Sequence, residues 1–400
     1  MTEVTFLPSW PLAWPSAATI ALLLLLGVGG GEAAARLGWP RLVGQTLAGL
    51  LFGLATVGLS ALEIELPDRA TSELALGSAL AVVLFEVGRR APWSWLGRNR
   101  ALLATSLAES ALSFIAVDLV LLACGMAPVA AAITAAVCMA SSPIVVLAIS
   151  KEFHTQGQIT ERSLLLAALN SGYAVVAGAL LMGWVHVEAR GAIDAWVLHP
   201  LYLVFGSLLL AWAGARLMGF LVCRLRGRDI SQLVVVLAVI GLVFLGAFSL
   251  RLSPLLATLA LGALARRFGV PGVPAFDAAI GVALIALFSL SAVAVDFEGW
   301  AAAWQVGLLV VVVRLAAKAI AVLGFIRPSG LAARKAGWLA LGLAPMSLPT
   351  LLLVHQVAIY DRQVGSAVGS VAIVAAVLMQ VAGAIALAWA LRRNGEMRHD

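Results

Sequence analysis

The sequence predicts an all-α polytopic membrane protein with about thirteen transmembrane helices, in which inverted repeats carry two broken, crossing helices. Hydrophobic residues make up 62% of the 400 residues and charged residues only 12%, and the mean hydropathy is +1.04. Apolar stretches long enough to cross a bilayer recur along the whole chain. Two of these stretches contain prolines well inside the apolar run, where proline breaks or kinks a helix.

The apolar stretches follow one another from near the N terminus to near the C terminus. In order, their expected bounds are 17–35, 42–60, 72–88, 101–124, 129–149, 164–185, 195–220, 231–250, 253–266, 278–296, 301–326, 337–358 and 364–391. A membrane-crossing helix needs about 20 apolar residues, so the ninth stretch is short unless its flanks extend it. The first seventeen residues contain no Lys or Arg, and we therefore expect no cleaved signal peptide.

The basic residues predict the orientation in the membrane. Of the 26 Lys and Arg residues, two fall inside a span, and only Arg69, Arg190, Arg251 and Arg362 fall in one set of alternating loops. The remaining twenty fall in the opposite set of loops and the C-terminal tail. Because Lys and Arg accumulate on the cytoplasmic side, we expect the N terminus outside and the C terminus in the cytoplasm of a bacterial-type inner membrane.

The fifth and twelfth stretches contain the two predicted breaks. The fifth carries Ser141, Ser142 and Pro143 just past its middle, and the twelfth carries Pro345 and Pro349. Proline cannot donate to a carbonyl one turn back, so backbone groups are freed at membrane depth. Because the two stretches lie seven spans apart, the spans around one stretch cross the membrane in the opposite direction to those around the other, as in an inverted repeat. We therefore expect the two breaks to meet near the midplane. Proline kinks that serve packing alone are the alternative.

Ionisable residues inside the spans are the candidates for function, because charge at membrane depth is unfavourable. Arg314 and Lys318 lie four residues apart, hence on one face of the eleventh span, and need acceptors inside the protein, although Lys318 could snorkel. Glu86 ends the third span, close to arginines at 89 and 90 that could pair with it. Glu109 and Asp118 lie inside the fourth; Glu109 fits ion binding or pairing with a buried base, and Asp118 lies toward the outer side.

Composition argues against an enzyme and against a nucleic-acid-binding protein. The net charge is +6, but the basic residues lie in short loops, as membrane orientation requires. Cys124, Cys138 and Cys223 lack metal-ligand spacing and are expected to serve packing. We find no nucleophile, metal cluster or phosphate loop with supporting context, and therefore expect no catalysis and no cofactor.

Several stretches are similar to those of one group of transporters. Trp39–Gly53 is similar to a glycine-rich second helix, Leu84–Gly88 to a Leu-Phe-Glu-x-Gly stretch, and Ala140–Leu147 to an unwound Ala-Thr-Asp-Pro helix. Lys318 falls where many members keep a basic residue, and Ala344–Pro349 falls where many carry a Pro-Arg-Gly-Glu-like sequence. The chain thus resembles the monovalent cation/proton antiporter superfamily, the sodium/proton and potassium/proton exchangers, through essentially all of its spans.

The departures from that family concern its ion-binding acids. Members of the family carry an aspartate on the sixth helix, in an Asn-Asp or Asp-Asp pair. The corresponding pair here is Asn170-Ser171, so serine stands in place of the aspartate. The Thr-Asp of the fifth helix reads Ser141-Ser142, and the Arg-Gly-Glu of the twelfth is absent. A serine hydroxyl can help to coordinate a hard cation but does not titrate near neutral pH. The chain therefore resembles a divergent member that lacks the ion-binding aspartate.

The resemblance implies alternating-access exchange of a monovalent cation, sodium or potassium, for protons at a site between helices 5, 6, 11 and 12. The expected ion-binding residues are Ser141, Ser142, Asn170, Ser171, Glu86 and Glu109, and the expected charge-compensating residues are Lys318 and Arg314. Glu86 is our first choice for the missing carboxylate, through its Leu-Phe-Glu match, and Glu109 the second. The alternatives are a transporter of something else, such as a small anion, and a transport-inactive relative that serves assembly or sensing.

The resemblance also implies how the single transmembrane domain is divided. Residues 101–185 and 301–391 are expected to form the core bundle that translocates the ion. Residues 17–88 and 195–296 are expected to form a scaffold whose glycine-rich spans make a homodimer interface. The expected surroundings are the lipid bilayer, with no nucleic acid.

Overall fold

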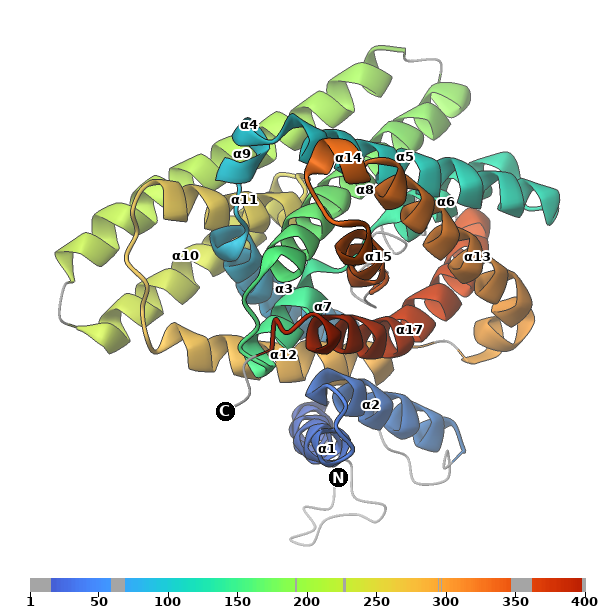
Figure 1. The fold of residues 1–400 in the computed structure, drawn as a ribbon. Helices are drawn as coiled ribbons and strands as arrows, with labels where there is room; N and C mark the ends of the chain where they lie inside the picture. Colours follow the sequence, from blue (N-terminus) through green and yellow to red (C-terminus); the bar gives the residue numbers. More distant parts are fainter. Residues whose placement is uncertain are drawn as a thin grey trace, which may run out of the picture.

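The structure, a computed structural model, describes residues 16–58, 69–190, 193–225, 228–293, 295, 297–346 and 362–397. All regular elements in these ranges are helices (Figure 1). The first half holds α1 (Ser16–Arg36), α2 (Arg41–Gly58), α3 (Arg69–Arg90), α4 (Ser94–Arg98), α5 (Arg100–Ala123), α6 (Pro128–Met139), α7 (Pro143–Glu152) and α8 (Gln158–Arg190). The second half holds α9 (Ile193–Arg224), α10 (Asp229–Ser249), α11 (Pro254–Arg267), α12 (Phe276–Val293), α13 (Phe297–Gly324), α14 (Ile326–Ser329), α15 (Ala333–Gly342) and α17 (Arg362–Arg393).

These helices match the apolar stretches expected from the sequence. Within the described residues, nine segments are long and apolar enough to cross a membrane, one of them the broken pair α6 and α7. Helices α2, α3 and α11 occupy the second, third and ninth expected spans, and α15 occupies the start of the twelfth, whose residues from 347 onward lie outside the described ranges. The prediction of an all-α polytopic membrane protein is confirmed.

Serine followed by proline begins two of the helices. In α7, Ser142 is the N-cap and its hydroxyl accepts a hydrogen bond from the backbone N–H of Val145 at 3.2 Å. In α11, Ser253 is the N-cap, with Pro254 at the first helical position. Serine satisfies an N–H at the helix start, and proline fits there because the first turn needs no donor from it. A serine N-cap followed by proline therefore begins α7, the part of the fifth expected span that follows the break.

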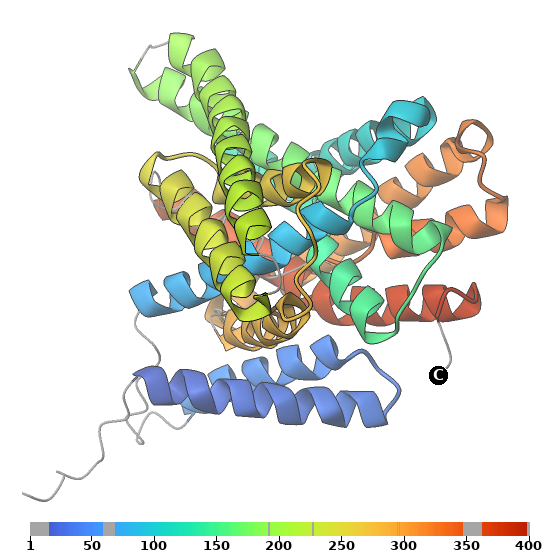
Figure 2. The same ribbon diagram turned by 90° about the vertical axis from the view of Figure 1, so that its left-hand side faces the viewer.

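Two groups of helices pack mainly within themselves. Helices α1 and α2 lie side by side along one edge of the molecule (Figure 1 and Figure 2), and α2 packs against α12, α12 against α3, and α3 against α11. In the other group, α13 packs against both α5 and α17, and α6 packs against α5, α8 and α17. The groups follow the expected scaffold and core, a division that stays a prediction.

Glycines let two helices of the first group approach backbone to backbone. A side chain at Gly262 of α11 would meet the carbonyl oxygen of Phe85 in α3, and one at Gly88 of α3 would meet that of Leu259 in α11. Small residues at such contacts are the usual means of close helix packing in membranes. The contact therefore fixes α3 against α11.

We predict that Gly262→Ala destabilises the protein, because the added methyl group meets backbone that cannot move aside cheaply. Overpacking of this kind typically costs about 1–3 kcal/mol. The matched control is Gly241→Ala in α10, where an added methyl group meets nothing within 4 Å. Thermal unfolding of the purified protein in detergent is the measurement, and equal melting temperatures for the two variants would contradict the close contact.

Candidate functional site

The two breaks in the chain are hydrogen-bonded to each other. The first is the extended segment between α6 and α7, and the second follows α15. The backbone N–H of Ser142 donates to the carbonyl of Pro345 at 2.8 Å, and the hydroxyl of Ser141 donates to the carbonyl of Leu343 at 2.7 Å. Backbone groups released in one break are thus satisfied by the other. Pro349, the second proline expected in the twelfth span, lies outside the described residues.

Arg314 of α13 joins both breaks through its guanidinium group. Its side chain is completely buried, and each of its three nitrogens donates to a backbone carbonyl. The acceptors are the carbonyls of Cys138 at 2.6 Å, Ala140 at 2.8 Å, Ala344 at 2.8 Å and Leu343 at 3.5 Å, and the hydroxyl of Ser141 at 3.4 Å. Arginine stays protonated and presents a rigid fork of donors. Arg314 therefore acts as a fixed cation that the ends of the broken helices surround.

A second buried group lies one turn further along α13. The ammonium of Lys318 donates to the carboxylate of Glu109 on α5 at 2.5 Å, and both side chains are completely buried. The other oxygen of Glu109 accepts a hydrogen bond from the side-chain amide of Asn170 on α8. The hydroxyl of Ser110 donates to the amide oxygen of Asn170 at 2.8 Å. One carboxylate is therefore held between three helices, with a base and an amide as its partners.

A cavity lies next to the first break, between α8, α3 and α11. Its lining is Leu80, Leu84, Ala140, Ser141, Ser142, Pro143, Ile144, Ser171, Gly172, Ala174, Val175, Leu255, Leu256 and Leu259. Its polar side chains are hydroxyls, and Ser171 already donates to the carbonyls of Ala167 at 3.0 Å and Ser141 at 3.3 Å. Among the described residues that line it, none is acidic. By itself, the cavity therefore provides only neutral oxygen atoms as ligands for a cation.

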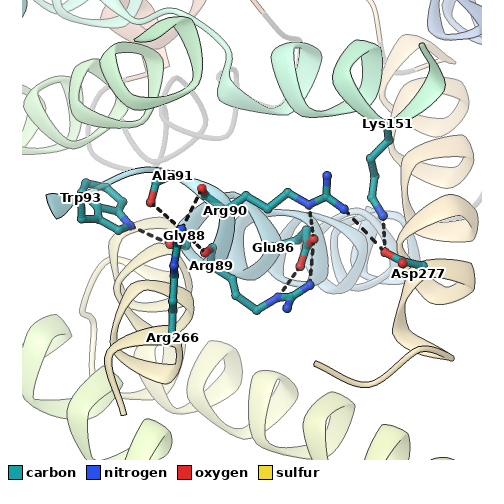
Figure 3. A network of polar contacts seen from close by, with 9 residues as sticks. All are labelled: Glu86, Gly88, Arg89, Arg90, Ala91, Trp93, Lys151, Arg266 and Asp277. Carbon is teal, nitrogen blue, oxygen red and sulfur yellow. Dashed lines mark hydrogen bonds and ion pairs between the residues drawn. The ribbon is translucent and has the colours of Figure 1, made fainter. Parts of the chain in front are cut away.

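Glu86 lies in a separate network at the end of α3 (Figure 3). Its carboxylate is completely buried and accepts from Arg89 at 2.8 Å and from Arg90 at 2.5 Å. Arg90 also lies 3.8 Å from Asp277 of α12, which pairs with Lys151 of α7 at 2.5 Å. These contacts match the ion pairing that the sequence left open for Glu86. The structure brings Ser141, Ser142, Arg314, Lys318, Glu109, Asn170 and Ser171 together around the breaks, and Glu86 makes its contacts elsewhere.

Sequence reasoning missed Ser110, although it directly follows Glu109 and bonds to Asn170. Asp118, a candidate from the sequence, makes no hydrogen bond or ion pair with the cluster among the described residues. The missed signal was the row of serines at 106, 110 and 113 around Glu109, whose spacing of three to four residues places them on one face of a helix.

Comparison with known proteins gives a family and a fold. The family model described as "Sodium/hydrogen exchanger, transmembrane" matches residues 20–392. Two structures of the sodium proton antiporter MjNhaP1 from Methanocaldococcus jannaschii are similar to this chain. One, at pH 8, has a TM-score of 0.64 and 15% identity and covers 95% of this chain and 96% of that one. The other, from electron microscopy, has a TM-score of 0.71 and 16% identity and covers 96% and 99%. No curated protein matches.

We predict that Arg314→Met strongly destabilises the protein. The substitution leaves several buried carbonyls without a donor, and each such group typically costs about 1–3 kcal/mol. Arg314→Lys should be intermediate, because one ammonium cannot reach acceptors in both breaks as a fork does. Arg267→Met, at an exposed position at the end of α11, is the control. Thermal unfolding in detergent measures the difference, and an unchanged melting temperature for Arg314→Met would refute the bridging role.

Proposed function

The chain belongs to the sodium/hydrogen exchanger family, and on that premise we propose that it exchanges a monovalent cation, sodium or potassium, for protons, with Glu109 as the group that binds both. The observation that carries this proposal is the buried contact of Glu109 with Asn170 and with Lys318, which lies one helical turn from Arg314 on α13. Competition between a proton and a cation requires a group that changes charge. Ser141, Ser142 and Ser171 cannot supply one.

The surroundings of Glu109 suit such an exchange. A carboxylate offers about four acceptor positions, and Glu109 uses two of them, for Lys318 and Asn170. The hydroxyl of Ser110 and the amide oxygen of Asn170 lie beside it as neutral oxygen ligands of the kind that hard cations prefer. A cation on Glu109 would compete with the ammonium of Lys318. Lys318 is therefore proposed as the counter-charge that makes cation binding and proton binding exclusive.

Alternating access is proposed to move the core bundle, 101–185 and 301–391, against the scaffold, 17–88 and 195–296. The cavity supports this division, because Leu80 and Leu84 of α3 and Leu255 of α11 line one side. The break and α8 line the other side. The cavity thus lies between the two proposed parts and would lead a cation to the hydroxyls of Ser141, Ser142 and Ser171. The homodimer, the bacterial-type inner membrane and the cytoplasmic C terminus belong to the same proposal.

A second candidate function is a transport-inactive relative that serves sensing or assembly. The specific observation that favours it is the lining of the cavity, in which no described residue is acidic. Glu109 is already neutralised by Lys318, and the carbonyls of the breaks are already bound to Arg314. An anion transporter finds less support, because the three nitrogens of Arg314 are engaged with those carbonyls.

We expect Glu109→Gln to abolish proton-coupled cation flux, since glutamine keeps the shape of the side chain but cannot exchange a proton. Glu86→Gln is the matched control: the side chain is the same, it is equally buried and it is ion-paired. Glu86→Gln should retain flux. The measurement is pH-dependent sodium and potassium flux through purified protein in liposomes, together with its melting temperature. Loss of flux in Glu86→Gln with normal flux in Glu109→Gln would reverse the assignment.

The substitution Ser171→Asp tests the second candidate. It places a carboxylate at the cavity, beside Ser141. If the unmodified protein moves no cation and Ser171→Asp confers exchange, the chain is an inactive relative. If the unmodified protein exchanges ions, we expect Ser171→Asp to change cation affinity or selectivity, because a second carboxylate joins the path. Both outcomes are read in the same liposome assay.

A further inference from the structure

One side-chain amide is shared by two neighbouring residues of α5. The amide nitrogen of Asn170, on α8, donates to a carboxylate oxygen of Glu109. The amide oxygen of Asn170 accepts a hydrogen bond from the hydroxyl of Ser110 at 2.8 Å. The exposed fractions of Glu109, Ser110 and Asn170 are 0%, 3% and 0%. The three side chains thus form one buried chain of hydrogen bonds that runs from Ser110 through Asn170 to Glu109.

The chemistry of the three groups sets the direction of this chain. An ionised carboxylate can only accept hydrogen bonds, so the nitrogen of the Asn170 amide must face Glu109. The amide oxygen then needs a donor, and the hydroxyl of Ser110 supplies it. The O–H group of Ser110 and the N–H group of Asn170 are therefore both directed along the chain toward the negative charge of Glu109.

Protonation of Glu109 removes the reason for this direction. A protonated carboxyl group has an O–H donor, which the amide oxygen of Asn170 could accept after half a turn of the amide. Every bond in the turned chain would join neutral groups. In the ionised state the bond from Asn170 to Glu109 is charge-assisted, and it polarises the amide so that the bond from Ser110 is strengthened as well. Loss of the Ser110 hydroxyl therefore destabilises the ionised state more than the protonated state.

The other charged and titratable groups around Glu109 are held by other contacts. Among the described residues, those on helices packed against α5 that act electrostatically on Glu109 are Lys318 and Arg314 of α13 and Tyr173 of α8. Lys318 donates to the second carboxylate oxygen at 2.5 Å, and Arg314 donates to the carbonyls of the breaks. We therefore expect a change at Ser110 to act on Glu109 through Asn170.

We propose that Ser110 is a positioning residue, which holds the Asn170 amide with its nitrogen toward Glu109 and thereby favours the ionised form of this carboxylate. Ser110 exchanges no proton itself and acts only through the orientation of the amide. The consequence for transport rests on the proposed exchange at Glu109, whereas the effect on the protonation of Glu109 does not. Ser110 thus sets the pH range in which Glu109 is ready to bind a cation.

The test is a pH titration of Glu109 by infrared difference spectroscopy on the purified protein, in a buffer free of sodium and potassium. The carboxyl band that is lost in Glu109→Gln reports the protonation of Glu109. Ser110→Ala should move the midpoint of this band to higher pH by about 0.5 to 1 unit, the size expected for the net contribution of one hydrogen bond. A midpoint that is unchanged or moves to lower pH overturns the proposal, and so does a Glu109 that titrates in neither protein.

Two further variants show whether the hydroxyl itself is responsible. Ser113→Ala removes a similarly buried hydroxyl of α5 other than the one bound to Asn170, and it should leave the midpoint unchanged. Ser110→Thr keeps a hydroxyl at position 110 and should keep the midpoint of the unmodified protein. If Ser113→Ala or Ser110→Thr shifts the midpoint as far as Ser110→Ala does, the effect comes from packing and the proposal is overturned.

Flux through liposomes separates this proposal from the proposed exchange. If the unmodified protein exchanges cations for protons, the pH profile of flux in Ser110→Ala should move to higher pH by the same amount as the infrared midpoint. A shifted midpoint with an unshifted flux profile refutes Glu109 as the exchange group and supports the positioning role of Ser110. If the unmodified protein moves no cation, exchange at Glu109 is refuted, and the infrared titration still decides the role of Ser110.

Discussion

The carbonyl groups released by two broken helices impose the main constraint on this structure. Water does not satisfy a free carbonyl at membrane depth, so irregular backbone persists there only where the protein supplies donors. Arg314 supplies them to both breaks at once, and the breaks add two hydrogen bonds between themselves. Lys318 follows one turn later on the same face of α13. The guanidinium therefore fixes the direction in which the ammonium meets Glu109.

This arrangement explains how the fold tolerates serine at position 171, where the resemblance leads one to expect an aspartate. Two buried cations, Arg314 and Lys318, would be strongly unfavourable if neither had a partner. Helix carbonyls surround the first, because the C-terminal end of a helix carries partial negative charge, and Glu109 pairs with the second. Neither cation needs a carboxylate at position 171. Ser171 is therefore compatible with a stable core, and its identity alone does not decide between exchange and inactivity.

Much of the fold could be predicted from the sequence, and less of the site. Hydropathy gave the spans, and proline gave both breaks, because these signals are local. The pairing of Lys318 with a buried acid also followed, since a cation at that depth needs a partner. Which of the candidate acids pairs with Lys318 did not follow, because it depends on which face of α5 turns toward α13 and α8. The arginines three and four residues after Glu86 were the available signal, and the likeness to a Leu-Phe-Glu stretch outweighed them.

Arg314 and Lys318, the two basic residues of α13 that lie at membrane depth, have different roles that follow from their chemistry. Arginine remains protonated in proteins and binds through a planar fork, whereas lysine is a compact charge that can lose its proton when buried. The fork lies where five acceptors from two segments converge, a task that needs constant charge and fixed geometry. The ammonium lies where a single carboxylate faces it, a contact that a proton or a cation on Glu109 would break. Arg314, whose charge and contacts stay constant, thus lies one helical turn from the Lys318–Glu109 contact that ion exchange would have to break.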